Sequence, residues 1–170
     1  LEVIDDDLRW LLRDDENGDP NISNDDNLLL YFSGHGHLDK ETGEGYWVPV
    51  DAPQTNGARG LKELFAVNQV INILNRVKAH HVVLIVDACF SGTFTRMTIE
   101  VPPGGDPNNP EEKPSRWALT AGRLETVLDK SPFAEALRNQ LIANTRSRLS
   151  IQTLGTSVKD LVAETGKQTP

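Results

Sequence analysis

The sequence predicts an α/β protein with a mostly parallel central sheet flanked by helices. The first observation is a run of five apolar, mostly β-branched residues at 82–86 without polar alternation, which is typical of a strand buried on both faces. A second apolar run occupies 28–32. Between the two runs, residues 64–77 carry apolar side chains at helical spacing, and such a helix supplies the crossover that parallel strands require.

The N-terminal part of the chain predicts a helix and an acidic loop. Residues 2–13 form the predicted amphipathic helix, because apolar residues recur at roughly helical spacing: Val3, Ile4, Leu8, Leu11 and Leu12, with Trp10 beside them. The loop that follows spaces six oxygen-bearing side chains like an EF-hand calcium loop: Asp15, Asn17, Asp19, Asn21, Ser23 and Asp26. Pro20 stands where that loop needs a glycine, so a solvated acidic loop is the favoured interpretation.

The middle of the chain predicts a hairpin followed by the crossover helix. A polar turn at 42–45 leads into a return strand at 46–50. The helix over 64–77 is expected to contribute only to the core, through Leu64, Val67, Val70, Ile71, Leu74 and Val77.

The C-terminal part predicts one more strand and two helices. Prolines and glycines mark 98–116 as a long irregular loop, before a buried strand at 117–122 and a loop at 123–130 that faces the site. Ser131 is the expected N-cap of a helix that buries Phe133, Ala136, Leu137, Leu141 and Ile142. Thr156 or Ser157 is expected to cap a last helix that runs to about Thr165.

Charge and composition exclude several classes of function. Residues 1–27 hold ten of the 25 acidic residues against two basic ones, so this segment accounts for the net charge of −8. No basic face is present, which argues against a nucleic-acid partner, and no apolar run is long enough to span a membrane. A single cysteine cannot form an internal disulfide, which fits a reducing compartment such as the cytoplasm.

Both apolar runs end in residues that carry chemistry. The first is followed by Ser-Gly-His-Gly-His, which contains His35, and the second by Asp-Ala-Cys-Phe-Ser-Gly, which contains the only cysteine, Cys89. Parallel strands end at one edge of a sheet, where α/β proteins bind their ligands. We therefore expect His35 and Cys89 to lie close together, so that the imidazole accepts the thiol proton and activates the sulfur as a nucleophile.

The glycines beside His35 have predicted roles of their own. Gly34 and Gly36 are expected to let the backbone turn tightly and approach a substrate. The Gly36 N–H is expected to form an oxyanion hole with the Cys89 N–H. A loop histidine without function is the alternative for His35, and the favoured interpretation for the other three histidines.

The segments YFSGHGH and VDACFSGTF together resemble the catalytic motifs of the caspase-like cysteine peptidases, most closely the metacaspases, paracaspases and bacterial caspase homologues. YWVPVDA, ALTAG and SPFAEAL extend the resemblance from Leu28 to about Leu141. It implies one catalytic domain over 1–170, a caspase-like α/β/α sandwich that lacks the family's first and last strands in this chain. It also implies a cysteine endopeptidase whose catalytic dyad is His35 and Cys89.

The resemblance further implies a substrate class. Asp87 matches the acidic residue of the S1 pocket, which binds the side chain before the scissile bond, in metacaspases and paracaspases; Ser33 is the expected second pocket residue. A carboxylate there favours Arg or Lys. The alternative for Asp87 is a strand-end acid that caps the following turn. Lys113 and Arg116 are candidate self-cleavage positions in the loop at 98–116, beside the alternative of a surface insertion.

The remaining expectations concern cofactors, partners and competing functions. No cofactor is expected: Asp51 matches one calcium-binding position of some metacaspases, but Ala66, Val67 and Arg96 depart from that pattern, so calcium remains only an open alternative. A peptide or protein substrate is expected, together with an activating partner or a second chain of the same precursor. A catalytically silent scaffold, a peptidase with another specificity and a small-molecule thiol hydrolase are the alternatives.

Overall fold

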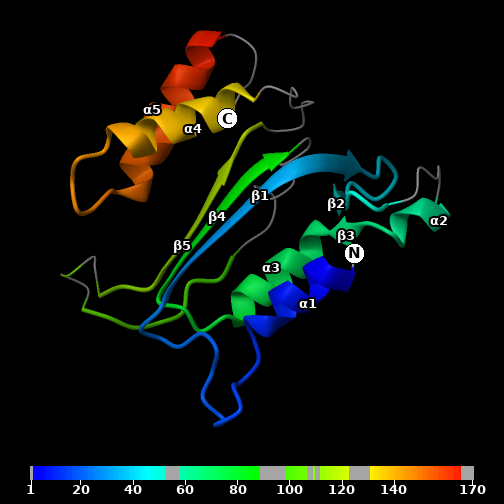
Figure 1. The fold of residues 1–170 in the computed structure, drawn as a ribbon, viewed down its shortest axis with the longest axis horizontal. Helices are drawn as coiled ribbons and strands as arrows, with labels where there is room; N and C mark the ends of the chain where they lie inside the picture. The colour runs from blue at the N-terminus through cyan, green and yellow to red at the C-terminus, as the bar shows by residue number, and fades with distance from the viewer. Residues whose placement is uncertain are drawn as a thin grey trace.

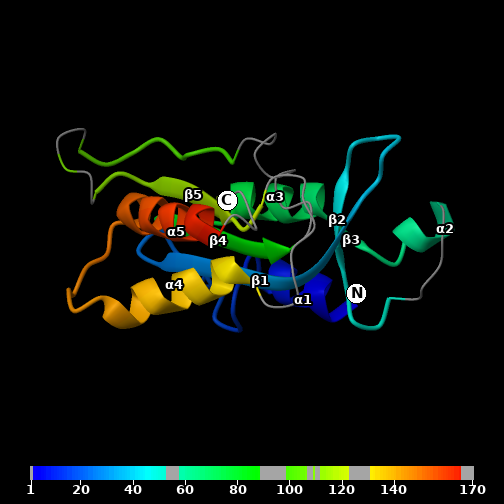
Figure 2. The ribbon, with the colours of Figure 1, turned by 90° about the horizontal axis from the view of Figure 1, so that it is seen from above.

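The computed structural model of the chain describes residues 2–52, 58–88, 99–106, 109, 112–122 and 131–165. Within these residues, five strands form a sheet in the order β3-β2-β1-β4-β5, with helices on both of its faces (Figures 1 and 2). Helices α1 (Glu2–Trp10) and α3 (Val67–Arg76) cover one face. Helices α4 (Pro132–Ala143) and α5 (Ile151–Thr165) cover the other. The predicted α/β architecture with helices on both faces is confirmed.

The central strands of the sheet are parallel, as the two apolar runs predict. β1 (Asn27–Leu38) pairs with β4 (His81–Ala88) in a parallel ladder that continues until Gly34 lies opposite Ala88. On its other side β4 pairs, again in parallel, with β5 (Ser115–Thr120). The crossover between β1 and β4 contains α3, as predicted.

The far end of β1 forms the predicted hairpin. Beyond Gly34, β1 pairs antiparallel with β2 (Gly45–Val48), and β2 pairs with the two-residue strand β3 (Phe65–Ala66), which follows α2 (Ala58–Leu61). Gly43 in the connecting turn has a φ of 75°, a left-handed conformation that glycine adopts without steric cost. The return strand is shorter than the predicted 46–50.

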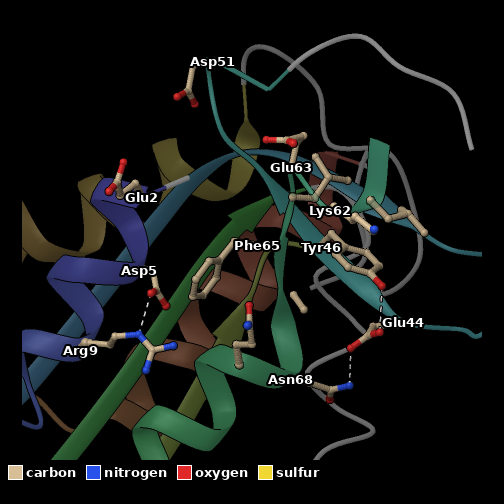
Figure 3. Close-up of a pocket in the computed structure, with 14 residues that line it drawn as sticks. Glu2, Asp5, Arg9, Glu44, Tyr46, Asp51, Lys62, Glu63, Phe65 and Asn68 are labelled. Carbon is tan, nitrogen blue, oxygen red and sulfur yellow. Dashed lines mark hydrogen bonds and ion pairs between the residues drawn. The ribbon is translucent and has the colours of Figure 1, made fainter. Parts of the chain in front are cut away.

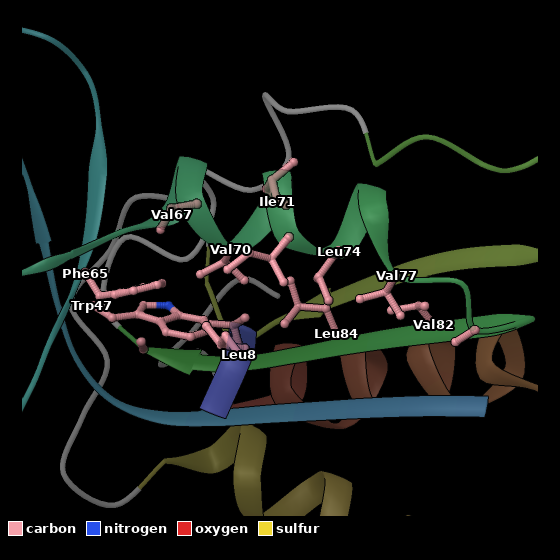
Figure 4. Close-up of a cluster of buried hydrophobic side chains, with 14 residues drawn as sticks. Leu8, Trp47, Phe65, Val67, Val70, Ile71, Leu74, Val77, Val82 and Leu84 are labelled. Carbon is pink, nitrogen blue, oxygen red and sulfur yellow. The ribbon is translucent and has the colours of Figure 1, made fainter. Parts of the chain in front are cut away.

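The larger core lies between the sheet and helices α1 and α3 (Figure 4). The helical spacing correctly predicts the buried face of α3, which contributes Val67, Val70, Ile71, Ile73 and Leu74. The helix begins three residues after the predicted start, because Phe65 and Ala66 are extended and pair with β2. Likewise α1 ends at Trp10 rather than at residue 13, and Leu8 is its one fully buried residue.

A second core lies between the opposite face of the sheet and helices α4 and α5. Ser131 caps α4 as predicted: its side chain accepts a hydrogen bond from the Ala134 N–H, and Pro132 occupies the first turn. Phe133, Ala136 and Leu137 are buried there as expected. Leu141 and Ile142 are 50% and 66% exposed, so their predicted burial is wrong; both lie in the last turn of α4.

Two further sequence predictions differ from the structure. The last helix begins at Ile151, several residues before Thr156, because the Ser150 side chain accepts the Thr153 N–H and starts it earlier. The strand predicted to be buried at 117–122 is β5, which spans Ser115–Thr120, and its Trp117 is 41% exposed. β5 pairs only with β4 among the described strands, so it lies at the sheet edge, which explains this exposure.

An aromatic stack between Phe32 and Trp47 packs the hairpin against the core, and Gly34 leaves room for it. The Phe32 and Trp47 rings are stacked with centroids 3.9 Å apart and an interplanar angle of 5°. A Cβ at Gly34 would lie 3.1 Å from the Phe32 ring, and the stack leaves that ring little freedom to move. Gly34 therefore permits a close side-chain contact within the strand.

Gly34→Ala is expected to lower the free energy of unfolding by about 1–2 kcal/mol, because overpacking a constrained ring is destabilising. Urea denaturation measures the change. Gly122→Ala is the matched control, because a Cβ at Gly122 meets no atom of the described residues within 4 Å, and it should be neutral or slightly stabilising. Equal stability of the two variants would contradict the importance of the contact.

Candidate active site

The predicted site residues lie at one end of the parallel ladder, where β4 ends and β1 changes its pairing partner to β2. Ser33 lies directly opposite Asp87, and Gly34 opposite Ala88. His35 is the next residue of β1 and is exposed. Cys89 follows Ala88 in the sequence and lies outside the described residues. The structure thus places Ser33, Asp87 and His35 at adjoining positions.

Strand alternation assigns these side chains to one face of the sheet. Successive residues of a strand point to opposite faces, so Ser33 and His35 share a face of β1, and Asp87 shares the face of Ile85 on β4. Ile85 belongs to the core beneath α4 and α5. The candidate site therefore lies on the same face of the sheet as α4 and α5.

Asp87 is the single charged residue among those fully buried in the described part of the chain, with 3% of its surface exposed. The Ser131 hydroxyl donates a hydrogen bond to Asp87 Oδ1 at 2.8 Å. Burial raises the pKa of the Asp87 carboxyl because it disfavours the charged form, and the Ser131 hydroxyl partly opposes this by lowering that pKa. A buried acid with a shifted pKa is a candidate for a functional role.

The structure corrects the predicted role of the two glycines. Gly34 and Gly36 both lie within β1, and neither is among the glycines with positive φ. They do not form a tight turn, because β1 continues without a break into its pairing with β2, where Gly36 lies opposite Trp47. The segment after the first apolar run is therefore a strand rather than a loop.

The chain matches a model of a known protein family over nearly its whole length. A family model described as the caspase domain matches residues 2–170. The chain belongs to the caspase family. A search of curated proteins found no match. Caspases are cysteine peptidases, so the family supports peptide-bond hydrolysis as the activity class of this domain.

Ser131 is the residue at this site that the sequence predicted only in part. Its pattern, Ser-Pro followed by an acid in the first helical turn, correctly indicates the N-cap of α4. Its hydrogen bond to Asp87 joins residues 44 positions apart, and no local pattern indicates such a contact. The N-cap signal could have located the residue, but only the packing of α4 against β4 identifies its partner.

The caspase domain has a hollow beside the hairpin, with a volume of about 710 Å³ (Figure 3). Its lining includes two basic residues, Arg9 and Lys62, and five acidic ones: Glu2, Asp5, Glu44, Asp51 and Glu63. The Tyr46 hydroxyl donates to Glu44 at 2.9 Å, and burial, aided by this carboxylate, raises the pKa of Tyr46 to about 12. This hollow contains Asp51, the residue matched to a calcium position.

The described residues provide no cluster of calcium ligands, either in the acidic loop after α1 or around Asp51. Among the described residues, no group of three or more His, Cys, Asp or Glu side chains is arranged to hold a metal ion. In the EF-hand-like loop, Asp15 accepts the backbone N–H groups of Asn17 and Asp19, and Asp26 accepts that of Ser23. These carboxylates act as local turn caps, which explains their lowered pKa values.

The described helices of the caspase domain include none with both the length and the apolar character needed to cross a bilayer. The loop predicted at 123–130 to face the site lies outside the described residues. The irregular segment predicted at 98–116 is shorter than expected, because β5 already begins at Ser115.

Arg116, one of two predicted processing positions, is built into the fold. It lies opposite Val82 in the β4–β5 ladder. Its guanidinium donates to the backbone carbonyls of Val77, Ala79, His80 and Ser115 at 2.9–3.3 Å. A peptidase requires an accessible segment, so this structural role argues against cleavage after Arg116. Lys113 is exposed ahead of β5 and remains a prediction.

Arg116→Gln is expected to lower the free energy of unfolding by about 1.5–3 kcal/mol, because hydrogen bonds from a charged, partly buried group are lost. Lys113→Gln is the control and should change it by less than about 0.5 kcal/mol, as is usual at exposed positions. Thermal or urea denaturation compares the two. Wild-type stability in Arg116→Gln would show that the guanidinium contacts contribute little.

Proposed function

We propose that this caspase-family domain is a cysteine endopeptidase that cleaves after Arg or Lys. The proposal rests on one observation: the parallel register that sets Ser33 opposite Asp87 and ends beside His35. Cys89 is the next residue after the β4 strand and carries the only thiol of the chain. This register supports a substrate pocket and a reaction centre that lie side by side at the end of the β1–β4 ladder.

In the proposed mechanism, the Cys89 thiolate attacks the carbonyl carbon of the scissile bond after His35 has taken the thiol proton. The Gly36 and Cys89 N–H groups stabilise the negative oxygen of the tetrahedral intermediate. The C–N bond then breaks, and His35 returns the proton to the leaving amine. Water hydrolyses the resulting thioester and regenerates the thiol.

The proposed specificity follows from the charge of the pocket. Asp87 is buried, and its described hydrogen-bond donor, Ser131, is neutral. Ser131 therefore does not balance the negative charge of the Asp87 carboxylate, and a cation in the pocket would. A guanidinium or ammonium group provides this cation, whereas an acidic side chain is repelled. Ser33, opposite Asp87, offers a hydroxyl to the same substrate side chain.

Matched fluorogenic peptides that differ only in Arg, Lys or Asp before the scissile bond test the proposal. The protein is assayed with and without calcium, and Cys89→Ala serves as the blank. Cleavage after Arg or Lys that disappears in the blank supports the dyad and the acidic pocket together. Cleavage after Asp would overturn the specificity. No cleavage of any peptide by the folded protein would favour a catalytically silent scaffold.

Activation by self-cleavage or by a partner is a further part of the proposal. A zymogen of this kind would convert to two fragments on incubation, and Cys89→Ala would remain intact. Mass spectrometry of the fragments identifies the cut. A calcium requirement, if present, appears in the same assay as a dependence of both cleavage reactions on the added ion.

A further inference from the structure

The Ser131 hydroxyl makes two hydrogen bonds in different parts of the fold. It accepts the Ala134 N–H at 3.2 Å, which caps the N-terminus of α4. It also donates to Asp87 Oδ1 at 2.8 Å, which connects that helix to the end of β4. The cap alone accounts for the first bond, whereas the second extends to the acid of the proposed substrate pocket.

The two bonds together determine where the hydroxyl proton points. A serine hydroxyl has one proton to donate and two lone pairs to accept with. Because a lone pair accepts the Ala134 N–H, the proton is free for Asp87. The backbone at Ser131 is extended, with φ −73° and ψ 114°, and Pro132 follows directly, so the donor is held by the start of a helix.

We propose that Ser131 is a positioning residue of the substrate pocket, whose hydroxyl orients the Asp87 carboxyl to receive the basic side chain of the substrate. The inference rests on the proposed function and adds a residue to its specificity. Holding Oδ1 leaves Oδ2, and the remaining lone pair of Oδ1, for a guanidinium or ammonium group. A neutral donor also preserves the negative charge, which a Lys or Arg at this position would neutralise.

Asp87 is buried, so its carboxylate needs a hydrogen-bond donor to stay charged and correctly oriented. A buried carboxylate without a donor would protonate or turn toward any available polar group, because leaving it unpaired is costly. Around Asp87, Ser33 on β1 and Ser131 before α4 are uncharged, and Glu135 of α4 is exposed. His35 and His37 are titratable groups further along the same face of β1. Ser131 thus supplies the described hydrogen bond to the acid.

The variants must separate positioning from helix capping. Ser131→Gly and Ser131→Ala both remove the hydroxyl, but glycine is a nearly adequate N-cap and alanine is a poor one. Ser131→Thr restores the hydroxyl and the cap. Ser150→Gly is the matched control, because Ser150 caps the neighbouring helix α5 by accepting the Thr153 N–H. Urea denaturation confirms that each variant is folded.

For peptides ending in Arg or Lys, Ser131→Gly and Ser131→Ala are both expected to raise KM about tenfold with kcat changed far less, the effect of losing one hydrogen bond to a charged group. Ser131→Thr should restore KM, and Ser150→Gly should match the wild type. If Ser131→Gly behaves like the wild type while Ser131→Ala is impaired, Ser131 is only a cap and the proposal is wrong.

A second measurement does not depend on cleavage. Carbon-13 NMR of the Asp87 carboxyl in the Cys89→Ala background should show a higher pKa with Ser131→Gly than without it, because a hydrogen bond that favours the carboxylate is lost. An unchanged pKa would overturn the positioning role. If wild-type protein cleaves no basic peptide but this pKa rises, the proposed function fails while the contact between Ser131 and Asp87 stands.

Discussion

Cys89→Ala and His35→Ala are each expected to reduce kcat/KM for Arg or Lys peptides by on the order of 10⁶-fold, the scale seen when a nucleophile or its base is removed. The thiol is a poor nucleophile until its proton is taken, and the imidazole has no substrate to act on without the thiol. Steady-state kinetics with the fluorogenic peptides measure both losses. Their sizes should be similar, because the two groups act in one step.

The double variant and a neighbouring histidine sharpen this prediction. His35→Ala combined with Cys89→Ala should be no worse than either alone, because residues that act as a unit are not additive. His37→Ala is the matched control: it changes an exposed histidine of the same strand, opposite Tyr46, and should retain near wild-type activity. Full activity in His35→Ala would exclude the dyad.

Asp87→Asn is expected to reduce cleavage after Arg or Lys by about 100-fold or more, because removing one partner of a buried charge pair leaves the other unpaired. The same change is expected to raise the free energy of unfolding at pH 7. The folded-state pKa of Asp87 is raised, so its stability contribution is present below the unfolded pKa and is lost as pH rises through the folded value. Kinetics and urea denaturation measure the two effects.

Asp26→Asn is the control, because it is expected to change the free energy of unfolding at pH 7 in the opposite direction. Asp26 accepts the Ser23 N–H and hydroxyl, both at 2.8 Å, and these bonds lower its pKa. Its contribution to stability is present above the unfolded pKa and is lost as pH falls through the folded value, so Asp26→Asn should destabilise the protein at pH 7. Asp87→Asn with reduced stability at pH 7 would contradict the idea that the buried charge is kept for function.

Much of the fold follows from local patterns. The apolar runs correctly predict that β1 and β4 are parallel, because strands joined through a helix must cross over. The spacing of Val70, Ile71 and Leu74 identifies the buried face of α3, and the sequence around Ser131 identifies the start of α4. Each of these signals lies within a few consecutive residues, where backbone sterics and hydrogen bonding dominate.

Other elements could not be predicted because their environment comes from distant parts of the chain. β3 is two residues long and exists because Phe65 and Ala66 pair with β2. Leu29 is 63% exposed although it lies in an apolar run, and Leu141 is 50% exposed on an otherwise apolar helix face. Apolar character indicates which residues gain from burial, but which of them are buried depends on what packs against them.

The sequence by itself determined the family motifs, the order of the main elements and the identities of His35, Cys89 and Asp87 as candidates. Only the tertiary structure decided that Ser33 faces Asp87, that Gly34 and Gly36 belong to a strand, and that Ser131 donates to Asp87. The reason is physical: motifs are local in sequence, whereas strand register and helix docking are set by packing between segments that are far apart along the chain.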